Sequence, residues 1–154
     1  MENKVIRTLN VYYYGVMVIA LIAAVLMYYL QIKGICPTID SLSSVGQIIQ
    51  YIVIFYALIT IPGGLYLCKQ KCKKLSQIPD GDDKLIGYQK AALLRILLVS
   101  GSMTLGIVAF YLMGGYQSML WIAAISAIGW YFTKPSLRKM ELELQPEDPN
   151  EEKY

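Results

Sequence analysis

The sequence predicts an all-α integral membrane protein: an antiparallel bundle of four transmembrane helices with both termini in the cytoplasm. Hydrophobic residues make up 56% of the 154 residues. Three stretches, 8–32, 41–68 and 96–133, contain no charged side chain, and each is long enough to cross a hydrocarbon core of about 30 Å. Lys and Arg are concentrated in alternate connecting segments, as expected for a chain that crosses a bilayer repeatedly.

The first predicted span covers residues 11–30. Lys4 and Arg7 precede it, as in a signal peptide, but the apolar run continues to Leu30 and exceeds the ~7–15 residues of a signal core. This segment therefore predicts an uncleaved anchor. Ala20 and Ala24 lie four residues apart and predict a small face for packing against another helix.

The second predicted span covers residues 46–67. The sequence Ser44-Val45-Gly46-Gln47 has the form of a capping box and predicts where this helix starts. Gln47 and Gln50 share one helix face and predict either an exterior vestibule or a hydrogen bond to another helix. Thr60 and Pro62, followed by two glycines, predict a structural kink or, alternatively, a break that adds to a polar path.

The third and fourth predicted spans cover residues 91–113 and 116–132. The 38 uncharged residues between Arg95 and Lys134 would run about 57 Å as one helix at ~1.5 Å per residue, so the chain is expected to turn at Gly114-Gly115. Small residues spaced by four predict close helix packing, either within one chain or in a homo-oligomer. These residues are Ser102 and Gly106 on the third span and Ala123 and Ala127 on the fourth.

The placement of Lys and Arg predicts the orientation. Lys33 is the one basic residue in a predicted exterior loop, against twelve in the predicted cytoplasmic segments, with Arg95 counted in its span. Arg95 is expected either to bind an anionic headgroup or to extend its side chain to the cytoplasmic surface. Contact with anionic lipid headgroups is predicted for Lys69, Lys71, Lys73, Lys74 and Arg95.

The three cysteines are split by the predicted membrane. Cys36 falls outside and is read as a lone thiol or, alternatively, an intermolecular disulfide. Cys68 and Cys72 fall at the cytoplasmic end of the second span, four residues apart, and a metal would need more ligands than these two. No metal or other cofactor is predicted. The tail, residues 135–154, changes from basic to acidic and predicts a short interfacial helix followed by a mobile segment.

The function predicted from these features is that of an accessory, scaffolding or regulatory component of a membrane complex, without catalytic chemistry of its own. The chain has no His, and the three uncharged stretches offer no acid for proton relay or acid–base catalysis. The alternative is a homo-oligomeric channel or facilitator for a neutral or weakly polar solute. The predicted partners are the bilayer and a second membrane protein or copy, without nucleic acid, in the plasma membrane or a bacterial inner membrane.

Overall fold

The structure, a computed structural model, describes residues 2–35, 38–79 and 81–145. These residues form five helices, and no strand occurs among them. The helices are α1 (Glu2–Ile32), α2 (Ser44–Ser76), α3 (Asp82–Leu112), α4 (Gln117–Phe132) and α5 (Leu137–Leu144). Three of them, α1, α2 and α3, are long and apolar enough to cross a membrane. Helix α4 coincides with the fourth predicted span but has only 16 residues.

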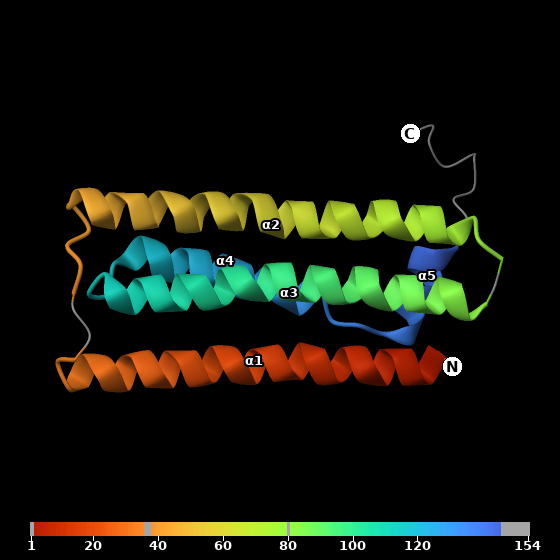
Figure 1. Cartoon of the computed structure of the whole chain (residues 1–154), viewed down its shortest axis with the longest axis horizontal. Helices are drawn as coiled ribbons and strands as arrows, with labels where there is room; N and C mark the ends of the chain where they lie inside the picture. The colour runs from red at the N-terminus through yellow and green to blue at the C-terminus, as the bar shows by residue number, and fades with distance from the viewer. Residues whose placement is uncertain (1, 36–37, 80, 146–154) are drawn as a thin grey trace.

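Helix α3 lies at the centre and packs against α1, α2 and α4 (Figure 1). The long helices lie side by side with alternating direction, and α4 runs beside the second half of α3. Helix α5 lies at the other end, where it packs against α2 and α1 (Figure 1). We call this the α5 end of the bundle: it comprises the first turns of α1 and α3, the last turns of α2, and α5 itself.

The helices extend beyond three of the predicted span ends, since α1 begins at Glu2, α2 ends at Ser76 and α3 begins at Asp82. Helix α2 begins after Ser43, whose hydroxyl accepts a hydrogen bond from the Gly46 amide at 3.0 Å, so the predicted capping box is placed one residue too late. The predicted turn between α3 and α4 is confirmed. Gly114 and Gly115 have φ of 62° and 88°, a left-handed backbone that glycine adopts without a steric penalty.

Helix α2 continues without interruption through Pro62. The alternative prediction, a break in the helix, is therefore not observed, while the kink stays a prediction: the proline side chain is exposed, and the helix persists on both sides of it. Thr60 donates its hydroxyl to the Tyr56 carbonyl at 2.7 Å. The Thr60 hydroxyl therefore forms its hydrogen bond within its own helix.

The contact between α3 and α4 is formed by small residues. A Cβ added to Gly106 would lie 3.0–3.1 Å from the backbone and Cβ of Ala123, closer than ordinary van der Waals contact. One turn away, the Ser102 hydroxyl donates to the Ser126 hydroxyl at 2.6 Å, and both side chains are fully buried. The missing side chain at Gly106 lets the two backbones approach, and the serine pair joins them.

Helix α1 is the least covered of the long helices. Four of its residues are buried, namely Ile6, Leu9, Tyr13 and Ala20, while Ala24 is half-buried. Tyr13 stacks on Trp130 of α4 with ring centroids 4.1 Å apart, which ties α1 to the end of α4. A separate buried cluster at the opposite end joins α2, α3 and α4 through Val53, Ala109, Met113 and Met119.

Candidate functional site at the α5 end

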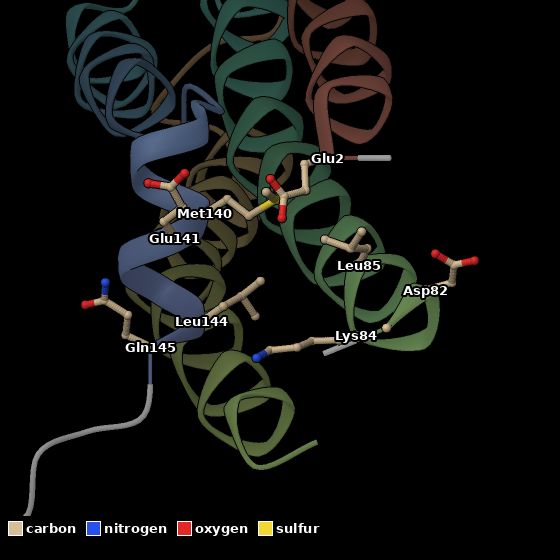
Figure 2. Close-up of a pocket in the computed structure, with 9 residues that line it drawn as sticks. Glu2, Asp82, Lys84, Leu85, Met140, Glu141, Leu144 and Gln145 are labelled. Carbon is tan, nitrogen blue, oxygen red and sulfur yellow. The ribbon is translucent and has the colours of Figure 1, made fainter. Parts of the chain in front are cut away.

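Helix α5 is short and amphipathic, and it docks through one face. Its N-cap, Ser136, accepts a hydrogen bond from the Lys139 amide at 3.2 Å. Met140 and Leu144, one turn apart, are buried in the same core as residues of α1, α2 and α3. Figure 2 shows both side chains extending from α5 toward α3, with Glu141 on the other side of the helix. An isolated helix of this length is not stable in water, so the helical state of α5 depends on this docking.

A buried ion pair fixes α5 to the centre of the bundle. The Arg95 Nη1 donates to the Glu143 Oε1 at 2.8 Å. Arg95 is only 3% exposed, and Glu143 is 23% exposed. Arg95 thus does not extend to the surface, which corrects that prediction from the sequence, while its contact with a lipid headgroup stays a prediction. The reason is that α5 covers the place where the guanidinium would otherwise meet solvent.

The pair is incompletely hydrogen-bonded. Arg95 Nε and Nη2 and Glu143 Oε2 are buried and have no hydrogen-bond partner in the part of the chain that the structure describes. Buried polar groups without partners cost free energy, and a buried ion pair with unfilled hydrogen-bonding positions adds little net stability. The pair therefore specifies where α5 docks more than it stabilises the fold.

Two cysteines face the same carboxylate. Cys68 and Cys72, each 2% exposed, have their sulfurs 3.9 Å apart, and their Sγ atoms and a Glu143 carboxylate oxygen all lie within 4.8 Å of one another. A cavity of about 340 Å³ reaches this cluster between α2, α3 and α5. Cys72, Arg95 and Glu143 line the cavity together with the basic residues Lys69, Lys73 and Lys139.

Lys139 adds positive charge at the rim of the cluster. Its ammonium donates to the Phe132 carbonyl at 2.6 Å. Burial, and then the neighbouring charge of Arg95, lower the pKa of Lys139. On the other side of α5 a second cavity, of about 480 Å³, separates α5 from Glu2 and from the start of α3 at Asp82 and Leu85 (Figure 2). Helix α5 thus has a hollow on both sides.

The residues of the predicted polar path are not brought together by these contacts. Gln47 is exposed and donates to the Leu42 carbonyl at 3.3 Å, and Gln50 donates to the Ser41 carbonyl at 3.0 Å. Both side chains therefore bond to the loop before α2, and neither of these bonds joins two helices. Pro62 and Thr60 lie farther along the same helix, in the positions described above.

The remaining predicted residues lie as follows. Lys69, Lys71, Lys73 and Lys74 are exposed along the last turns of α2, and Ala127 is half-buried on α4. The thiol of Cys36 and the acidic residues after 145 fall outside the described residues.

Two residues of the contacts described above, Glu143 and Ser126, are not among the predicted site residues. Glu143 belongs to an acidic run by composition, whereas the adjacent i, i+4 pairs Lys139/Glu143 and Met140/Leu144 are a signal for an amphipathic helix with one charged edge. Ser126, in the α3–α4 contact, lies between Ala123 and Ala127, and no pattern in the sequence singles it out. No family model, curated protein or solved structure matches the chain.

Proposed function

We propose that this chain is a regulatory accessory component of a membrane complex, in which α5 docks on the bundle or leaves it as partners bind. The observation that carries the proposal is the Arg95–Glu143 pair, a buried but incompletely hydrogen-bonded contact between a bundle helix and a short terminal helix. A contact of this kind specifies one docked position of α5 and adds little net stability to it.

The proposed setting is a multi-pass protein with four spans and both termini in the cytoplasm. Helix α4 has 16 residues and is about 24 Å long. Together with the Gly114-Gly115 turn that precedes it, it serves as the fourth span. The α5 end then faces the cytoplasm, because the basic residues of the α2–α3 connection are found there. Plasma or bacterial inner membranes fit this charge distribution.

Lipid is the first partner in this proposal. Lys69, Lys71, Lys73 and Lys74 would meet anionic headgroups, with about 1 kcal/mol of attraction for each lysine near the surface. Their exposure along the last turns of α2 supports this assignment. A second membrane protein, or another copy of the chain, is the second partner.

The regulatory role is favoured over a channel. Gln47 and Gln50 bond to the adjoining loop, and the Ser102 hydroxyl bonds to Ser126. Polar groups already occupied in this way do not lend themselves to lining a path for solute. Catalysis is not part of the proposal, and the alternative of a passive facilitator has no observation of its own to favour it.

The experiment compares two variants of α5 in native membranes. Met140→Asp places a charge at a position that is 1% exposed and should undock α5, whereas Leu142→Asp changes a position on the same helix that is 59% exposed. Affinity purification in mild detergent should recover the same membrane proteins with wild-type chain and Leu142→Asp, and a different set with Met140→Asp. Identical sets for all three would contradict the proposal.

A further inference from the structure

We infer that Cys68, Cys72 and Glu143 form a binding site for a thiophilic divalent cation, with Zn²⁺ the ion whose geometry fits. All three ligand atoms come from buried or half-buried side chains at the α5 end, and two helices supply them. The site requires α5 to be docked. It goes beyond the proposed regulation, because the purified chain without partners is expected to bind the ion.

The spacing of the two sulfurs carries the choice of ion. Two thiolates at about 2.3 Å from a tetrahedral ion lie about 3.8 Å apart. The Cys68 and Cys72 sulfurs are 3.9 Å apart without any rearrangement. One carboxylate oxygen of Glu143 lies within 4.8 Å of both sulfurs, so a small movement of one flexible side chain completes a three-ligand set. Cysteine and carboxylate are both ligands that zinc accepts.

Arg95 acts as the outer partner of the carboxylate. It holds Oε1 of Glu143 at 2.8 Å, while Oε2 is buried without a partner among the described residues. In the proposed site Oε1 keeps its hydrogen bond to Arg95, and Oε2 turns from beside the Tyr88 hydroxyl to the ion. Ligating carboxylates in metal sites are held by such outer-shell contacts.

The charge of the cluster also balances. Zn²⁺ replaces the two thiol protons, which leave to solvent, so the buried cluster of two sulfurs, Glu143 and Arg95 keeps its net charge. The cavity of about 340 Å³ reaches Cys72 and Glu143, and provides both an entry path and room for a water as fourth ligand.

The test is a titration of the reduced, full-length protein in detergent with Co²⁺, which reports tetrahedral thiolate coordination by visible and near-ultraviolet absorption. Wild type should bind one Co²⁺ per chain with thiolate-to-metal bands, and Zn²⁺ should displace it. Cys68→Ser and Cys72→Ser should each abolish the bands. Glu143→Gln should weaken binding by at least about tenfold.

Cys36→Ser is the matched control and should bind as wild type does. Helical content measured by circular dichroism on every variant separates loss of a ligand from loss of the fold. Absence of thiolate bands in wild type would overturn the site, as would bands that survive in folded Cys72→Ser. Because the titration uses purified protein without partners, its outcome is independent of the co-purification experiment with Met140→Asp.

Discussion

Arg95 and Glu143, 48 residues apart in the chain, meet through one hydrogen bond of 2.8 Å that joins α3 to α5. Removing one member of a buried pair leaves the other charge without a partner, whereas removing both leaves neither. The two changes therefore have different consequences, and this difference measures what the pair contributes.

Arg95→Met alone should destabilise the protein clearly. Breaking a buried pair costs about 3–5 kcal/mol, and because Glu143 is 23% exposed we expect the lower end of that range. The double variant Arg95→Met/Glu143→Leu should recover most of the loss. The measurement is the thermal unfolding midpoint in detergent, and a double variant at least as destabilised as the single one would refute the expectation.

Gly106→Leu should lower the same midpoint. A side chain there meets the backbone of Ala123 at 3.0 Å, which α4 cannot relieve without moving, and overpacking of this kind costs about 1–3 kcal/mol. Gly15→Leu is the control, because a Cβ at that position of α1 meets nothing within 4 Å. Equal midpoints for the two variants would mean that the α3–α4 contact is not close.

Ser102→Ala, Ser126→Ala and the double variant form a second test of that contact. Hydrogen bonds between helices in a membrane contribute on average about 0.6 kcal/mol and at most about 1.7 kcal/mol. At 2.6 Å and full burial, this bond should show a positive coupling energy within that range in a double-mutant cycle. Strict additivity of the two single changes would exclude the bond.

The orientation is testable by labelling of single cysteines on intact cells. Cys68 and Cys72 are each 2% exposed and would escape an impermeant thiol reagent on either side of a membrane. Their lack of labelling would therefore say nothing about orientation, and both are replaced by serine. In that background Cys36 should be labelled directly. Lys71→Cys, at an exposed position and with Cys36 also replaced, should be labelled only after permeabilisation. The reverse pattern would invert the topology.

The long helices and the turn between α3 and α4 follow from local patterns. Uncharged stretches and the Gly114-Gly115 pair predict them because the physical causes, burial from water and positive φ, act at those residues. The extension of α2 to Ser76 and of α3 back to Asp82 lies outside the uncharged stretches and is not contained in that pattern.

The site at the α5 end depends on tertiary contacts that local patterns do not contain. Arg95 taken alone is a cation near the end of a span. Extending its side chain to the surface has the lowest free energy as long as no other element covers it, and α5 does cover it. Cys68 and Cys72 alone are two ligands too few for a tetrahedral ion, and Glu143 becomes relevant only when the chain folds back. The helical pattern around Met140 predicts α5, but not the surface on which it docks.

The most direct measurement of the central claim, that α5 docks on a cytoplasmic face, is limited trypsin digestion of sealed vesicles with that face outward. Among the tryptic sites on that face, Arg138 and Lys139 are the two within α5, and docking holds Lys139 through its bond to the Phe132 carbonyl. In wild type and Leu142→Asp, cleavage at these bonds should be slow. It should be rapid in Met140→Asp and blocked in vesicles of the opposite orientation. Equally rapid cleavage in wild type and Met140→Asp would contradict the account.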